Sequence, residues 1–132
     1  MPDNTPEPLS AFDTLYRSEA RQAILDIVAR ELATGASVED RAEHYTEKGK
    51  PDFVLAYLLD SPLPDERKRE LYATAHERRA VYIEQRAREF DRRFHRAFPL
   101  LDTEAANDRA TARRIRAGMP PSKGRGRQIP LI

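Results

Sequence analysis

The 132-residue sequence has no cysteine, only five glycines and no long apolar run, and each absence excludes a class of protein. Without cysteine the chain has no disulfide, no thiolate nucleophile and no cysteine-bound zinc or iron–sulfur centre. Two of the five glycines lie in the last nine residues, which leaves little material for a phosphate-binding loop. The longest apolar run, FVLAYLL at residues 53–59, is far shorter than the roughly 20 residues of a membrane-spanning helix. We therefore expect no membrane among the partners of this chain.

The first nine residues have a composition of their own. Residues 1–9 contain three prolines and show no helical periodicity, which is typical of a flexible leader. They also lack the positive segment and the apolar segment that make up a secretory signal. Together with the absence of cysteine, this favours a cytoplasmic protein.

Charge is abundant and unevenly distributed along the chain. Asp, Glu, Lys and Arg make up 34% of the residues, yet the formal net charge is only +1. Residues 1–66 hold 14 acidic and 6 basic side chains, whereas residues 67–132 hold 8 acidic and 17 basic ones. After Asp108 the sequence has seven basic residues and no acidic one. Such a separation carries information about partners, because it gives the two halves opposite signs.

Apolar residues recur at three- and four-residue spacing through most of the chain, and this pattern predicts an all-α fold. We expect a single helical domain over residues 10–117 and an extended, basic and apolar tail over residues 118–132. The domain is predicted to contain a three-helix N-terminal unit, one long helix and a short basic helix. The expected helix ranges, from caps and breaks, are 10–35, 37–49, 51–60, about 65–98 and 102–118.

The long helix of about residues 65–98 predicts self-association. Such a helix would be about 50 Å long, whereas a compact chain of this size is only about 36 Å across. Its far end carries Phe90, Phe94 and Phe98, which the rest of the chain would cover poorly. We therefore expect a homodimer in which these three side chains contact a second copy.

The first three predicted helices, RQAILDIV, SVEDRAEHY and PDFVLAYLL, resemble the helix-turn-helix core of small bacterial repressors over about 45 residues. In those repressors the third helix enters the major groove and reads base edges. Here that helix offers Asp52, Phe53, Tyr57 and Asp60 and has no basic or amide side chain for the bases. The pattern is therefore interpreted as a packing unit.

The histidines show no pattern typical of catalysis or metal binding. Asp40 and His44, like Asp91 and His95, lie one helical turn apart, which is the spacing of an ordinary ion pair on a solvated helix face. His76 has no serine or threonine partner that the sequence can place. We expect no catalytic residue, no metal and no cofactor, so the chain is predicted not to be an enzyme.

The C-terminal segment supports two hypotheses. Its basic residues are able to bind phosphate, and the run at residues 124–127 resembles the Gly-Arg centre of an AT-hook without the flanking prolines. The candidates for nucleic-acid contact are Arg109, Arg113, Arg114, Arg116, Lys123, Arg125 and Arg127. The chain then ends in IPLI, which an electrostatic arm does not need and which would dock on a protein. The candidates for partner contact are Arg125, Arg127, Ile129, Leu131 and Ile132.

The apolar ending and the negative first half favour a non-catalytic helical interaction or adaptor protein. On this hypothesis the chain binds an unidentified protein partner through its C-terminal arm and its charged long helix. The alternative is a nucleic-acid-binding protein that uses residues 109–127 for phosphate contacts.

Overall fold

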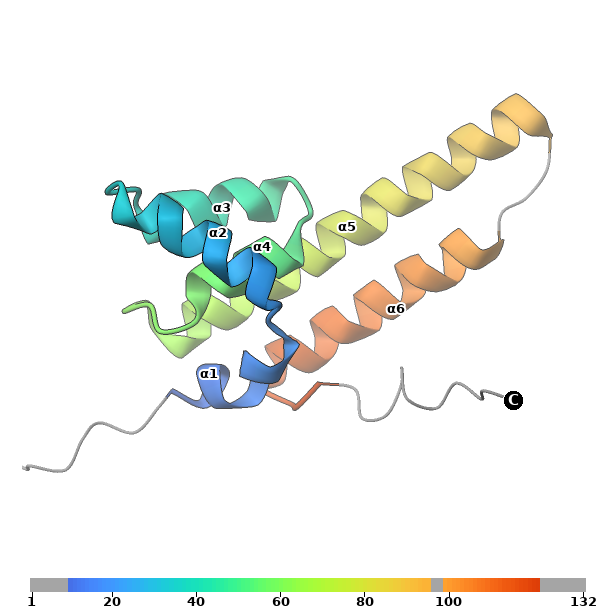
Figure 1. Ribbon diagram of the computed structural model, residues 1–132. Helices are drawn as coiled ribbons and strands as arrows, with labels where there is room; N and C mark the ends of the chain where they lie inside the picture. The colour runs from blue at the N-terminus through green and yellow to red at the C-terminus, as the bar shows by residue number, and fades with distance from the viewer. Residues whose placement is uncertain (1–9, 96–98, 122–132) are drawn as a thin grey trace, which may run out of the picture.

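The computed structural model describes residues 10–95 and 99–121, and over these ranges the chain is all-α, which confirms the predicted fold class (Figure 1). No strand occurs in the described residues. The elements are α1 (Ala11–Tyr16), the short 3-10 turn η1 (Arg17–Glu19), α2 (Gln22–Ala33), α3 (Val38–Glu47), α4 (Pro51–Leu58), α5 (Asp65–Phe94) and α6 (Pro99–Arg116). None of these helices combines the length and hydropathy that a bilayer span requires.

The stretch that periodicity predicts as one helix from residue 10 to residue 35 is divided into α1, η1 and α2. Ser10 caps α1 as expected, with its Oγ accepting from the Asp13 N–H at 3.0 Å. The chain then becomes extended at Ala20, with φ −78° and ψ 142°. The break lets the two parts of one apolar stripe face different neighbours, because α1 packs on α5 whereas α2 packs on α4.

Helix α4 lies at the centre of the core. Pro51 is the first residue of α4, where the lack of a backbone N–H costs no hydrogen bond within the helix. Residues 54–59 are all buried, as its apolar sequence predicts. Around α4 pack α2, α3 and the first half of α5 (Figure 1).

Helices α5 and α6 form a long antiparallel hairpin that extends beyond the other helices (Figure 1). Here the structure differs from the sequence-based expectation. Helix α5 ends at Phe94 rather than near residue 98, because His95 takes a left-handed conformation with φ 54°. Pro99, expected to end the long helix, is instead the first residue of α6. Residues 96–98 lie outside the described residues.

Helix α6 packs closely on α5, because small side chains line the contact between the two helices. Buried alanines recur every seven residues on both helices, and the residue three positions after each of them is buried or half-buried. On α5 the alanines are Ala73, Ala80 and Ala87, and on α6 they are Ala105 and Ala112. The residues three positions later include His76 on α5 and Asp108 and Ile115 on α6, all buried. Half of the long helix is thus covered by its own chain.

Candidate functional site

A cavity of about 530 Å³ lies where five parts of the chain meet, and it is the candidate site of this molecule. Its walls come from α1 with η1, the first turn of α4, the middle of α5, residues 104–115 of α6 and the prolines at 120 and 121. The hairpin brings α5 and α6 together, and α1 closes the side toward the C-terminal end of α6 (Figure 1). A volume of this size falls in the range of small-molecule sites.

The charged floor of the cavity consists of His76 and Arg79 from α5 and Asp108 from α6. The Nδ1 of His76 is 2.7 Å from Oδ1 of Asp108. Arg79 donates to both oxygens of the same carboxylate, from Nε to Oδ2 at 2.9 Å and from Nη2 to Oδ1 at 2.8 Å. His76 and Arg79 stand one helical turn apart, so both reach the single acid that α6 presents.

The protonation of this trio follows from its geometry. Burial opposes ionisation of Asp108, but the hydrogen bonds from His76 and Arg79 outweigh burial, and the pKa of the carboxyl is lowered. An ionised carboxylate accepts a hydrogen bond, so Nδ1 of His76 carries the proton and donates it. In the tautomer with the proton on Nδ1, the acceptor nitrogen of the imidazole is Nε2. Among the described residues this Nε2 is buried and has no hydrogen-bond partner.

The aromatic wall of the cavity is built by Tyr16 and Tyr72, whose ring centroids are 5.5 Å apart. The Tyr72 ring also lies 5.1 Å from the His76 ring, edge to face. Burial raises the pKa of both phenols, and the carboxylates of Glu19 and Asp52 raise that of Tyr72 further. Both tyrosines are therefore neutral at physiological pH.

The segment after α6 is held against this wall by two side chains. The Tyr16 hydroxyl donates to the Met119 carbonyl oxygen. Arg114 donates to the Pro120 carbonyl oxygen from Nε at 3.1 Å and from Nη2 at 2.7 Å. These contacts place the prolines at 120 and 121 at the edge of the cavity.

The lining as a whole is acidic. Four carboxylates line the cavity, those of Glu19, Asp52, Glu104 and Asp108, against two guanidinium groups, those of Arg79 and Arg114. The charge of Arg79 is offset by Asp108. The remaining excess is negative, and two of its carboxylates, Glu19 and Asp52, act on the Tyr72 phenol.

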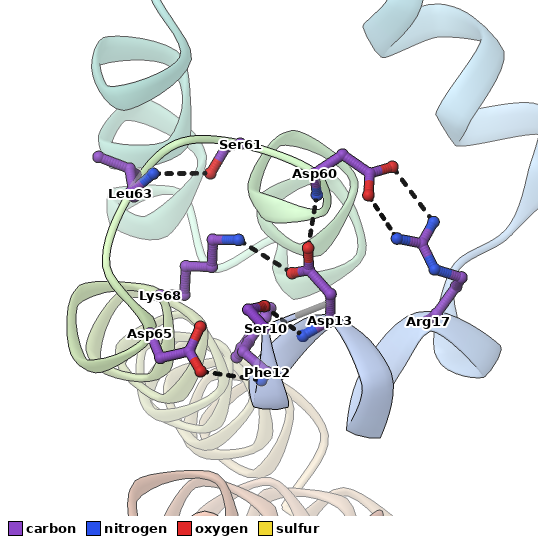
Figure 2. A network of polar contacts seen from close by, with 9 residues as sticks. All are labelled: Ser10, Phe12, Asp13, Arg17, Asp60, Ser61, Leu63, Asp65 and Lys68. Carbon is purple, nitrogen blue, oxygen red and sulfur yellow. Dashed lines mark hydrogen bonds and ion pairs between the residues drawn. The ribbon is translucent and has the colours of Figure 1, made fainter. Parts of the chain in front are cut away.

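A buried ion pair fixes α1, and with it the Tyr16 wall. Lys68 Nζ is 2.9 Å from Oδ1 of Asp13, and both side chains are buried. The other oxygen of Asp13 accepts the Asp60 N–H at 3.0 Å, and Arg17 pairs with the Asp60 carboxylate. Figure 2 shows these contacts converging between α1, the end of α4 and the start of α5. The network positions α1 on the end of α4 and the start of α5.

Four arginines of α6 are predicted from the sequence to contact phosphate. In the structure most of them are bound to other groups of the chain. Arg109 pairs with Glu84, and Arg116 pairs with Glu70 at 3.0 Å and with Glu77 at 2.5 Å. Arg114 is engaged by the Pro120 carbonyl, whereas Arg113 is exposed to solvent. The other predicted contact residues, Lys123, Arg125, Arg127, Ile129, Leu131 and Ile132, lie outside the described residues.

The predicted self-association residues lie at the outer end of α5. Phe94 is 55% exposed, and its ring centroid is 4.7 Å from that of the half-buried Phe90. Phe98 lies outside the described residues. Among the described residues at this end, the Phe94 side chain is therefore largely exposed.

Sequence reasoning missed the partnership of His76 with Asp108. The two residues are 32 positions apart on two different helices, and no local sequence pattern links them. The seven-residue spacing of alanines on both helices is the feature that would have revealed the interface, because it predicts a seam of close contact.

Within the described ranges, no three His, Asp or Glu side chains are grouped so that they could hold a metal ion. Comparisons of the chain with protein-family models, with curated proteins and with solved structures return no match.

Proposed function

We propose that this chain is a non-catalytic helical interaction protein that associates with a second copy through the outer end of the α5–α6 hairpin. Its C-terminal arm, ending in IPLI, serves as the contact for a further protein partner. The observation that supports the proposal is a contrast at the hairpin surface. The arginines Arg109 and Arg116 are paired with the chain's own carboxylates, whereas Phe94 stays uncovered.

The contrast favours a protein over a nucleic acid as the partner. Phosphate binding depends on basic groups whose counterions are released, and an arginine that is already paired contributes less to it. An exposed aromatic side chain at the end of a projecting element is typical of a protein contact.

Sedimentation velocity of the full chain over a range of concentrations tests self-association. We expect a species of about twice the 15.1 kDa monomer mass at tens of micromolar. Phe94→Ser should return the chain to the monomer without unfolding it, because the side chain is already 55% exposed. The control Ile27→Ser changes an apolar residue of similar type that is 36% exposed on α2, and it should leave the dimer intact. A wild-type chain that stays monomeric at every concentration contradicts the proposal.

Fluorescence anisotropy with labelled duplex DNA and single-stranded RNA tests the alternative. We expect no binding by the full chain at low salt. If the chain binds with a log–log salt slope of roughly −4 or steeper, the basic segment 109–127 is a nucleic-acid element and the adaptor proposal fails.

A further inference from the structure

We propose that the cavity between α5, α6 and α1 binds a small organic cation, namely a protonated amine carried on an apolar or aromatic body. The inference does not rest on self-association, since the cavity lies away from the outer end of the hairpin. Nε2 of His76 accepts a hydrogen bond from the amine, and Tyr16 and Tyr72 contact the body.

An unused acceptor at the floor of the cavity points to a ligand. His76 is only 8% exposed, and its Nδ1 is occupied by Asp108. Among the described residues Nε2 has no partner, although buried polar atoms are nearly always hydrogen-bonded. A donor placed in the adjoining cavity would satisfy it.

The charges of the lining select a cation. Glu19, Asp52 and Glu104 outnumber Arg114, the guanidinium of the lining that is bound to a carbonyl, because Arg79 is already bound to Asp108 at two atoms. Asp52 has an ion-pair partner, Arg21, at 3.6 Å on the solvent side. An anion would meet these carboxylates, whereas an ammonium group is attracted to them and to the faces of the tyrosine rings.

The size and shape of the cavity select a small molecule. A volume of about 530 Å³ is enclosed on several sides by helices and by the segment 119–121. The apolar part of the lining, which includes Ile83, Ile115 and the prolines at 120 and 121, suits a hydrocarbon or aromatic body.

The same His76–Asp108 pair also occupies one layer of the helix seam, where a polar pair helps to fix the register of α6 on α5. A purely structural role would not respond to small molecules. Histidine resonances therefore make the best readout, because they report on the imidazole itself.

The experiment records long-range ¹H–¹⁵N spectra of the three imidazoles in the full chain during titration with three probes. The probes share a phenyl body and differ in the head group: 2-phenylethylamine, 2-phenylethanol and 3-phenylpropionate. We expect the His76 signals to shift saturably with the amine, while the signals of the exposed His44 and His95 stay in place. If no probe moves the His76 signals, or if the carboxylate moves them as strongly as the amine, the proposal is overturned.

A charge-neutralising variant sharpens the test without disturbing the core. Glu104 is exposed on α6 at the edge of the cavity, so Glu104→Gln should fold normally and weaken amine binding roughly three- to tenfold. Glu66→Gln is the matched control, since Glu66 is exposed on α5 and does not line the cavity. Equal affinities for wild type and Glu104→Gln would overturn the assignment of the acidic rim.

Discussion

At the scale of single residues, we expect the largest change in the free energy of unfolding from substitution in the buried pair of Lys68 and Asp13. Lys68 is 1% exposed, and its ammonium lies 5.9 Å from the centre of the Phe12 ring as well as beside Asp13. Removing one charge of such a pair costs more than the pair contributes, because the other charge is left buried without a counter-ion.

We expect Asp13→Asn to lower the free energy of unfolding by about 3–5 kcal/mol, measured by urea denaturation. The asparagine oxygen still accepts the Asp60 N–H, so the loss reports on the charge of Lys68. Adding Lys68→Met should recover most of the stability, since an uncharged pair of similar volume needs no counter-ion. A double variant as unstable as Asp13→Asn would show that the charge of Lys68 is not the cause.

The Asp108 carboxyl makes the free energy of unfolding depend on pH, and the direction of its pKa shift gives the sign. Burial alone would raise its pKa, but the hydrogen bonds from His76 and Arg79 hold it below the ordinary value of 3.8. In the unfolded chain the pKa returns to that value, so the contribution to stability is complete above about pH 4 and is lost as the pH falls through the lower folded pKa.

We expect the free energy of unfolding to fall as the pH drops below about 4, and to fall less steeply in Asp108→Asn. The variant should also be less stable at pH 7 by about 2 kcal/mol, since it loses charged hydrogen bonds. Urea unfolding at a series of pH values measures both effects. Parallel pH profiles for the two proteins would contradict the assignment of Asp108.

At the scale of elements, the end of α3 depends on a glycine that also lies against α5. Gly49 has φ +66°, and its N–H and that of Lys50 bond back to the last turn of α3. A Cβ at position 49 would lie 2.9 Å from Cδ2 of Tyr82 and 3.0 Å from the backbone nitrogen of Arg79.

Gly49→Ala should therefore destabilise the chain by about 2–4 kcal/mol, from the left-handed conformation and from the close contact with α5. Gly118→Ala is the matched control, because Gly118 has φ +70° but open space around its Cα. That variant should cost only about 1–2 kcal/mol, measured by the same urea titration. Similar losses at both positions would show that the contact with Tyr82 and Arg79 has no energetic weight.

Most helices were predictable from sequence because their signals are local. The serines at 10 and 37 cap α1 and α3, and Pro51 opens α4, as the spacing of apolar residues predicts. The break after α1 and the end of α5 at Phe94 were not predictable, because tertiary packing causes the first and a left-handed His95 accompanies the second. Neither residue 20 nor residue 95 is a glycine or a proline, so neither marks an interruption.

At the scale of the whole molecule, the separation of charge along the sequence is largely satisfied within one chain. Acids of α3 meet basic residues of α5, since Glu39 and Glu43 both pair with Arg67. The arginines of α6 meet acids of α5 in the same way. Such exposed pairs are worth little individually, but together they bring the acidic and the basic parts of the sequence into contact within one chain.

The candidate site could not be predicted from the sequence, because segments far apart in the chain assemble it. His76 and Asp108 could each be noted in the sequence, but their meeting depends on the register of two helices. The cavity beside them further depends on α1 and on the segment 119–121. No local pattern encodes an arrangement of five segments.

The hydrogen bond from Tyr16 to Met119 joins residues 103 positions apart, and this has a consequence for the order of assembly. Closing so long a loop has a length-dependent entropic cost of roughly 4 kcal/mol. We therefore infer that α1 docks after α5 and α6 have paired, because their pairing brings the ends of this loop closer together.

We expect α1 amides such as that of Thr14 to exchange with deuterium faster than those of α4, which hydrogen-exchange mass spectrometry or NMR can measure. Equal protection in the two helices would contradict this order. Release of α1 would remove the Tyr16 wall and give a ligand a route into the cavity.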